Sequence, residues 1–312
     1  MNLFELPHLV LPEAGAAPRW TRGCFFRRAI TFFDGATDTT TLVVWLQTRG
    51  LTFDLRIAPG RPRPHDLGEL RRLSLDDVVR LAEAEGGLAE STFEAGTTET
   101  SGSMNWGGWV RAQVHDGWPE PGELRRVGDC LTEFAPSGAY VEDWRAQRSS
   151  PGVLVGLVLL TENDARTGAV LHAGGGLVVA GDHAGLVRGR PTALPPFPRL
   201  VDCVRAADGE RERWDDVFRF EASYATRSAS GDYVVAASTL PFREGRQLMS
   251  LDGFTVEGDL VVQRATEDDV DIERRFRLET CEPYDGERAT SASPAAQSWL
   301  DAEASTLLRN AR

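Results

Sequence analysis

The residues best suited to chemistry form an alternating charged pair near the start of the chain. Within the strand-like run 51–57, Asp54 and Arg56 lie two positions apart, so an extended backbone turns both to one face. The other face of this run is apolar. Inside a barrel the pair could orient a polar group of a ligand, because buried charges need partners. On an outer face it would be a solvated bridge between strands, of little energetic consequence.

Tryptophans in three strand-like runs offer large apolar walls, each with one N–H donor. Trp45 lies on the run that adjoins the charged pair, and Trp106 and Trp109 lie three positions apart on a later run. In a regular strand these last two face opposite sides, unless a bulge at residues 107–108 turns both inward. The tryptophans either line a pocket for a flat or apolar molecule or pack in the core. The predicted ligand-binding residues are Trp45, Asp54, Arg56, Trp106, Trp109, His115 and Trp144.

Two glutamates on neighbouring predicted strands are the candidate catalytic residues. Glu133 and Glu142 would face each other if these strands pair inside a barrel. Repulsion between the two carboxylates would then raise the pKa of one of them, which could act as a general acid. The alternative is two carboxylates that are neighbours by chance in an acidic protein.

The sequence predicts no metal site and no cofactor. His172 and His183 flank a glycine-rich turn and Asp182 precedes the second, so a site of two histidines and one carboxylate is conceivable. Their spacing of eleven residues matches no ligand motif, and ordinary histidines are the favoured interpretation. Residues 174–181 resemble a dinucleotide-binding loop only in their glycines, because no helix is predicted to follow them. Ser238 lacks the G-x-S-x-G context of a hydrolase nucleophile.

Composition excludes several classes of protein. The 312-residue chain has a formal net charge of −13, which argues against binding to nucleic acid or to anionic membrane surfaces. All 34 basic residues are arginine, which excludes a Schiff-base lysine and a P-loop lysine. The four cysteines form no C-x-x-C pair, so we expect free thiols. There is no apolar run of about 18 residues and no basic start typical of a signal peptide, and we expect a cytoplasmic protein.

The elements that must hold the candidate residues are mostly short strands separated by turn residues. This pattern predicts an all-β sandwich or barrel rather than parallel α/β units. A Ser-Ser-Pro-Gly segment divides two strand-rich halves. We expect a first domain over 20–149, a second over 150–283, and a linker with a C-terminal helix over 284–312. The predicted strands are 24–33, 41–48, 51–57, 88–96, 99–115, 123–127, 129–134, 139–147, 153–161, 168–173, 176–181, 184–188, 217–227, 232–239, 253–263 and 270–280, and the predicted helices are 74–85, 198–207 and 294–309.

Four segments carry a resemblance to a known family. They are the hairpin VVWLQT-x-x-x-x-FDLRIAPGRP at 43–62, the tryptophan-containing stretch at 103–145 that closes with E-x-W, the stretch at 157–191, and GDYVVAASTLPFREGRQL at 231–248. The chain resembles the Hri-type proteins, a small fungal and bacterial family. The resemblance implies two lipocalin-like antiparallel β-barrels in tandem and brings no established catalytic residues. An N-terminal extension, a strand pair after residue 250 and the C-terminal helix depart from the family pattern.

These features together predict that a barrel binds a small hydrophobic or aromatic metabolite. An acidic group of that ligand would pair with Arg56. A cofactor-independent isomerase, cyclase, hydratase or lyase, of the kind used in biosynthesis, is the alternative, because such chemistry leaves almost no local signature. A third reading is a protein-interaction module, or a homodimer, through apolar residues of the C-terminal helix: Leu300, Leu307 and Leu308. A cavity with a converging arginine or glutamate favours the first two readings, and barrels filled by their own side chains favour the third.

Overall fold

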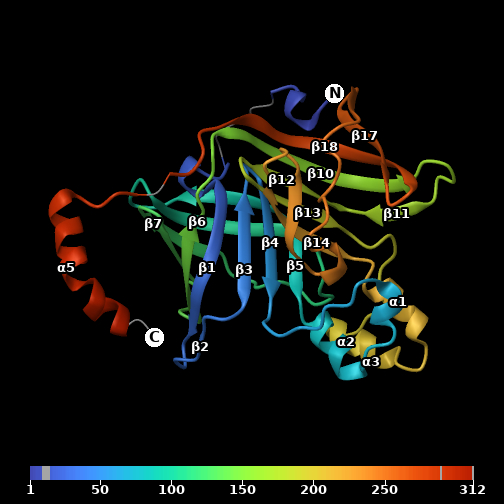
Figure 1. Ribbon diagram of the computed structural model, residues 1–312, viewed down its shortest axis with the longest axis horizontal. Coiled ribbons are helices and arrows are strands. Elements are labelled where there is room, and N and C mark those ends of the chain that lie inside the picture. Colours follow the sequence, from blue (N-terminus) through green and yellow to red (C-terminus); the bar gives the residue numbers. More distant parts are fainter. Residues whose placement is uncertain (9–14, 289, 311–312) are drawn as a thin grey trace.

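The protein is built mainly from two antiparallel β-sheets that pack against each other, with a group of helices at one side (Figure 1). The computed structural model describes residues 1–8, 15–288 and 290–310, and for 307–310 it describes the backbone only. The predicted β-rich architecture is confirmed. Among the described residues, no helix combines the length and the apolar character that a membrane span requires.

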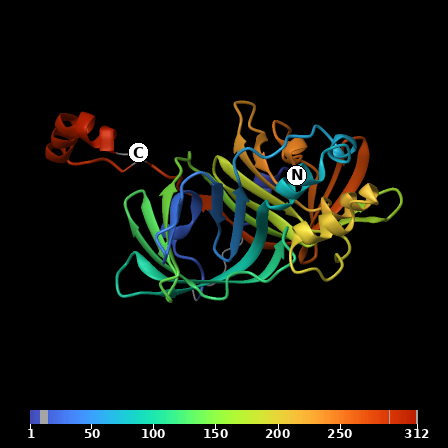
Figure 2. The same cartoon turned by 90° about the horizontal axis from the view of Figure 1, so that it is seen from below.

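Eight strands of the first sheet close into an antiparallel barrel. The sheet follows chain order from β1 to β9, and β9 returns to pair with β1 along its length. The strands can be followed as they curve around this barrel in Figure 2. The short β2 pairs only with the end of β1. The strands are β1 (Gly23–Phe32), β2 (Thr37–Asp38), β3 (Leu42–Gln47), β4 (Leu51–Ile57), β5 (Glu85–Ala95), β6 (Ser101–Arg111), β7 (Gly122–Val127), β8 (Cys130–Phe134) and β9 (Tyr140–Ala146).

The second sheet is open, because its edge strands β15 and β16 do not pair with each other in the described part of the chain. Apolar residues from outside the sheet, Leu3, Leu6, Leu248 and Met249, complete the core on one of its faces. The structure therefore shows one closed barrel and one open sheet where the sequence predicted two barrels. The strands are β10 (Gly152–Asp164), β11 (Val170–Ala173), β12 (Gly175–Ala180), β13 (His183–Arg188), β14 (Glu221–Arg227), β15 (Tyr233–Ser238), β16 (Phe254–Glu257), β17 (Leu260–Glu267) and β18 (Val270–Tyr284).

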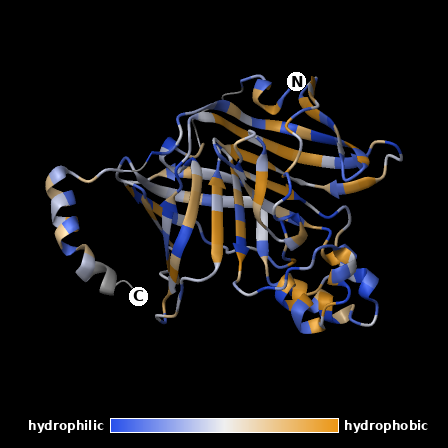
Figure 3. Cartoon of the chain, viewed as in Figure 1, coloured by the Kyte–Doolittle hydropathy of each residue, from blue (hydrophilic) through white to orange (hydrophobic). Residues whose placement is uncertain are grey.

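Four short helices pack into one apolar cluster beside the sheets, and a fifth stands apart from the body (Figures 1 and 3). The clustered helices are α1 (Leu67–Leu70), α2 (Leu75–Ala82), α3 (Leu200–Ala206) and α4 (Trp214–Val217), and the separate one is α5 (Pro294–Asn310). Leu300 on α5 is exposed, whereas the side chains of Leu307 and Leu308 lie outside the described residues. Single 3₁₀ turns occur at Leu3–Glu5, Arg19–Thr21, Arg211–Arg213 and Pro241–Arg243.

The contact between the two sheets decides which way β4 faces. Its apolar residues Phe53 and Leu55 belong to a core shared with Val178 and Val187 of the second sheet. Phe53 lies so close to Gly185 that a Cβ on that glycine would be 2.6 Å from the ring. Because the apolar face of β4 is taken by this contact, its alternate residues must point into the barrel. The charged pair of β4 therefore faces the barrel interior.

Several predicted elements differ from the observed ones. The predicted strand 217–227, for example, begins in α4, and β14 starts at Glu221. The predicted helix 74–85 ends at Ala82, because Glu85 starts β5 and pairs with Arg56. The predicted strand 253–263 is a hairpin of β16 and β17, which turns at Gly258 with a φ of +67°. This left-handed conformation suits glycine and ends the first strand. Strand pairing thus sets the end of the helix, and a glycine turn divides the predicted strand.

Candidate functional site

A pocket of about 380 Å³ lies inside the first barrel. All seven predicted ligand-binding residues line it, and so does Glu133. They come from five strands and the β6–β7 connection, so only closure of the barrel brings them together. Glu142 lies directly opposite Glu133 on the paired strand. The predicted set of site residues did not include the other lining residues, which are Thr52, Glu85, Gly86, Arg111, Gln113, Asp116, Gly117, Trp118, Pro119 and Tyr140.

Indole rings form the apolar wall of the pocket. The ring of Trp45 meets that of Trp144 edge-on at 5.5 Å and that of Trp106 at 6.4 Å between centroids. Trp45 donates its Nε1–H to Gln47 at 3.1 Å, and Trp106 donates to Thr52 at 3.0 Å. These two N–H groups are occupied, so the rings offer apolar surface to an occupant.

A β-bulge brings Trp109 to the same pocket as Trp106. The pairing of β5 with β6 shifts register between Leu88 and Glu90, which leaves one extra residue on β6. Gly108 takes a φ of +62° at this point. The extra residue reverses the alternation of the strand, so residues three apart both line the pocket. The bulge that the sequence required for this arrangement is present.

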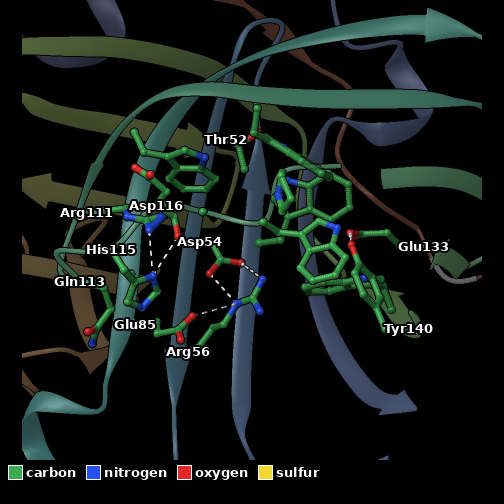
Figure 4. A pocket seen from close by; sticks show the side chains of 18 residues that line it. Thr52, Asp54, Arg56, Glu85, Arg111, Gln113, His115, Asp116, Glu133 and Tyr140 are labelled. Carbon is green, nitrogen blue, oxygen red and sulfur yellow. Dashed lines mark hydrogen bonds and ion pairs between the residues drawn. The ribbon is translucent and has the colours of Figure 1, made fainter. Parts of the chain in front are cut away.

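Arg56 and Asp54 form an ion pair that the pocket leaves accessible. The guanidinium Nε donates to Oδ1 of Asp54 at 2.9 Å, and Glu85 Oε2 lies 4.0 Å from the same nitrogen. Asp54 holds the pKa of Arg56 well above its usual value, so the guanidinium stays charged. Its side chain is 38% exposed and lines the pocket (Figure 4). A polar ligand group could therefore reach this cation without breaking its bond to Asp54.

A second set of polar side chains lies on the side of the Asp54–Arg56 pair opposite Glu133 and Tyr140 (Figure 4). Arg111 Nη2 lies 3.2 Å from His115 Nδ1, and Gln113 donates to the carbonyl oxygens of Ala82 and Ala84 at 2.9 Å. The two hydrogen bonds of Gln113 connect the pocket rim to the end of α2. Only His115 of this group was predicted, because the rim depends on where β6 leaves the sheet.

Glu133 is the unusual carboxyl group of the pocket. Burial and the nearby Glu142 carboxylate raise the pKa of Glu133 to about 8. Tyr140 donates its hydroxyl to Glu133 Oε1 at 3.0 Å, whereas Glu142 accepts from Arg27 at 2.7 Å. The two carboxyls are thus unequal, because the cation lies beside only one of them. The raised pKa favours the protonated form of Glu133.

One donor in the pocket wall has no acceptor. The Nε1–H of Trp144 is buried and has no hydrogen-bond partner among the described residues. Buried donors are usually satisfied by protein, water or a ligand. This N–H is an unsatisfied buried donor in the pocket wall rather than a group exposed to the pocket.

The histidines near the glycine-rich turn lie outside this pocket. His172 Nδ1 lies 3.1 Å from the Gly189 carbonyl, and His183 contacts the Tyr224 hydroxyl at 2.8 Å and the Arg148 carbonyl at 2.9 Å. One ring nitrogen of His172 and both ring nitrogens of His183 thus contact protein groups. No group of three or more histidines, cysteines and carboxylates arranged to hold a metal ion occurs in the described part of the chain.

No protein-family model matches the chain, and no curated protein matches it. Among solved structures, the chain is similar to an uncharacterized protein from Saccharomyces cerevisiae, with 10% sequence identity and a TM-score of 0.45. The match covers 84% of this chain and 99% of the yeast chain. So distant a likeness carries no argument about function, and the residues of the pocket alone bear on it.

Proposed function

We propose that the first barrel binds a small hydrophobic or aromatic molecule in the pocket between the tryptophans and Arg56. The observation that carries this proposal is the pocket of about 380 Å³, walled by indoles and lined by an accessible guanidinium. Its volume lies within the range of about 300–1,000 Å³ that is typical of small-molecule sites. An acidic group on the ligand would lie beside Arg56, because a guanidinium pairs well with carboxylate or phenolate oxygens.

The fluorescent aromatic sulfonate 1-anilinonaphthalene-8-sulfonate tests this proposal. Five of the eight tryptophans line the pocket, so its binding there should quench much of the indole emission. The pocket variant is Asp54→Asn with Arg56→Gln, which removes both charges together. The matched control is Asp143→Asn with Arg145→Gln, an ion pair at the same spacing that does not line the pocket.

We expect the pocket variant to bind the sulfonate about tenfold more weakly or worse, as the loss of a charge-assisted hydrogen bond implies. The control variant should bind like the wild type. Equal binding by both variants would place the dye elsewhere and count against the proposal.

A cofactor-independent proton-transfer enzyme is the second candidate function. Glu133 favours it, because a carboxyl with a pKa of about 8 that lines a ligand pocket is poised to give up a proton near neutral pH. Glu142, held as the partner of Arg27, would keep that proton on Glu133. An isomerase, cyclase, hydratase or lyase would use Glu133 in this way, and Glu133→Gln would abolish turnover while leaving binding intact.

An interaction role through α5 is a third candidate. Trp299 and Leu300 are 59% and 40% exposed on this separate helix. Truncation before residue 294 would turn a homodimer into a monomer in sedimentation analysis if α5 were the contact. The hollow first barrel gives this reading less support than it gives to ligand binding.

We also propose that the fold is related to that of the Hri-type proteins. Two lipocalin-like units in tandem, as in the Hri-type proteins, would account for a barrel followed by a second sheet of similar size. A first unit over 20–149 and a second over 150–283 fit this proposal, because β9 ends at Ala146 and β10 begins at Gly152.

A further inference from the structure

The Glu133 side of the pocket carries hydrogen-bonding capacity that the protein leaves unused. Tyr140 satisfies Oε1 of Glu133, and no hydrogen bond from a described residue reaches Oε2. Glu133 as a whole is only 6% exposed. Its unbonded Oε2 is nevertheless not one of the fully buried atoms without a hydrogen bond, so this oxygen retains some exposed surface. Since Glu133 lines the pocket, this oxygen is open to an occupant.

The charges around Glu133 decide which form it takes. On β9, Glu142 and Tyr140 face it, and on β4, Asp54 and Arg56 lie within range. Glu142 and Asp54 disfavour a further negative charge, whereas Arg56 favours it but is already bonded to Asp54. Burial adds to the effect of the two carboxylates. The outcome is an uncharged carboxyl group, which donates a hydrogen bond through its O–H.

Trp144 belongs to the same wall. Its side chain is 2% exposed and lines the pocket, and its indole N–H is buried without an acceptor among the described residues. Because that N–H is itself buried, the polar atom that the β8–β9 wall offers to an occupant is Oε2 of Glu133. Figure 4 shows Glu133 and Tyr140 on the far side of the pocket from Arg111 and His115.

We propose that the β8–β9 wall of the pocket recognises an uncharged oxygen acceptor, such as the carbonyl of an aromatic ketone, through the carboxyl O–H of Glu133. This inference rests on the proposed ligand-binding function and adds a second polar group to the ligand. The occupant is then an aromatic carbonyl compound, with its acidic group toward Arg56 and its carbonyl oxygen toward Glu133. No bond is made or broken in this step.

The test uses 6-propionyl-2-dimethylaminonaphthalene, a neutral aromatic ketone whose emission moves to longer wavelength when its carbonyl accepts a hydrogen bond. The matched probe is 2-dimethylaminonaphthalene, which lacks the carbonyl. Affinities are measured by fluorescence between pH 6 and about pH 10, a range that spans the pKa of Glu133. Circular dichroism at each pH confirms that the protein stays folded.

For the wild type, we expect the affinity for the ketone to fall about five- to tenfold as the pH rises through about 8, the loss that one hydrogen bond implies. Glu133→Gln keeps an N–H donor and cannot titrate, so it should bind the ketone at pH 7 like the wild type and show no fall. Glu133→Leu should bind about five- to tenfold more weakly at all pH values. Glu123→Gln, on the neighbouring strand and outside the pocket, should behave like the wild type.

A ketone affinity that does not change with pH in the wild type would overturn the inference. So would a fall with pH that persists in Glu133→Gln, or one that the carbonyl-free probe shows equally. If the sulfonate dye binds in an Arg56-dependent manner while the ketone shows no such fall, only this inference fails. If neither dye nor ketone binds, the proposed function fails with it.

Discussion

The first barrel and the second sheet both bury carboxyl groups, but they treat them in opposite ways. In the barrel, no cation among the described residues lies within hydrogen-bonding distance of Glu133, and its pKa rises to about 8. On the second sheet, Glu162 and Glu221 are as deeply buried, yet their pKa values fall to about 2. Burial raises all three pKa values, so the neighbouring arginines make the difference.

The buried charges of the second sheet form a closed network. Arg188 binds Glu221 at 2.7 Å and Glu162 at 3.3 Å, and Arg274 binds Glu162 at 2.5 Å and Glu267 at 2.6 Å. Three arginines, with Arg243 as the third, meet three glutamates. The network needs no ligand, because its members satisfy one another.

The barrel interior is built on a different plan. An apolar cluster that includes Trp45 and Trp144 fills part of the interior, and the same two rings line the pocket. Its polar groups are only partly satisfied by the protein, as the accessible Arg56 and the unpartnered Trp144 N–H show. The comparison shows that the second sheet pairs its buried charges with one another, whereas the barrel leaves part of its polar groups without a protein partner among the described residues, as the proposed ligand site requires.

The largest expected effect is the loss of stability when acid protonates the arginine–glutamate network of the second sheet. A carboxyl whose pKa is lowered in the folded state stabilises the protein above its usual pKa of 4.5, and this stabilisation is lost as pH falls toward 2. Glu162 and Glu221 each contribute about 3 kcal/mol on this basis. Urea unfolding followed by circular dichroism between pH 6 and about pH 2.5 measures the loss. A free energy of unfolding that does not change over this range would contradict the network.

Removing one arginine from the network comes next. Arg274→Met leaves Glu162 and Glu267 without their closest cation, because Arg274 is fully buried and binds both. We expect the free energy of unfolding to fall by about 3–5 kcal/mol. The neighbouring exposed Arg275, paired with Glu273, is the control, and Arg275→Met should cost less than about 1 kcal/mol. Equal losses of unfolding free energy in the two variants would show that burial of the ion pair does not contribute to its effect on stability.

Glu133→Gln should have the opposite effect and stabilise the protein at high pH. A carboxyl whose pKa is raised in the folded state stabilises fully below its usual pKa of 4.5, and this contribution is lost as pH rises through about 8. The glutamine variant escapes that loss, so it should exceed the wild type by about 2–4 kcal/mol at pH 9 and match it near pH 4. Its unfolding is compared with that of the wild type in urea at both pH values. A variant that is less stable than the wild type at pH 9 would mean that Glu133 is ionised and well paired.

The two strand ion pairs should show the smallest stability effects. Arg56 and Arg145 are 38% and 36% exposed, and each pairs with an aspartate two residues earlier. Removing either pair should change the free energy of unfolding by less than about 1 kcal/mol, as for other exposed pairs. Thermal unfolding of the two double variants checks this. A large loss in the Asp54/Arg56 variant alone would mean that the pair holds the barrel together rather than serving a ligand.

Much of the pocket could be predicted from the sequence because local alternation encodes it. The charges of β4 alternate with apolar residues, and Glu133 and Glu142 lie on adjacent strands joined by a short turn. Gly107 and Gly108 signalled the bulge that turns Trp109 inward. Spacing within one hairpin was sufficient in each case.

The arginine–glutamate network of the second sheet could not be predicted in this way. Its glutamates and arginines come from β10, β13, β14, β17, β18 and the turn at Pro241–Arg243, so its pairing depends on the register of an entire sheet. Tyr140 and Arg111 were missed for a related reason, since each is an ordinary strand residue until the barrel closes. The open edge of the second sheet also depends on segments distant in sequence, such as Leu3 against Met249.

Native mass spectrometry with just enough 1-anilinonaphthalene-8-sulfonate to occupy most wild-type chains tests the difference between the two interiors most directly, because it counts the dye molecules bound per chain. The account predicts one bound dye for most chains of the wild type and of the Asp143→Asn/Arg145→Gln control, and mostly unoccupied chains for Asp54→Asn/Arg56→Gln, as at least tenfold weaker binding implies. Retention of the dye by the pocket variant, or a wild-type chain that binds none, would contradict a ligand site in the first barrel.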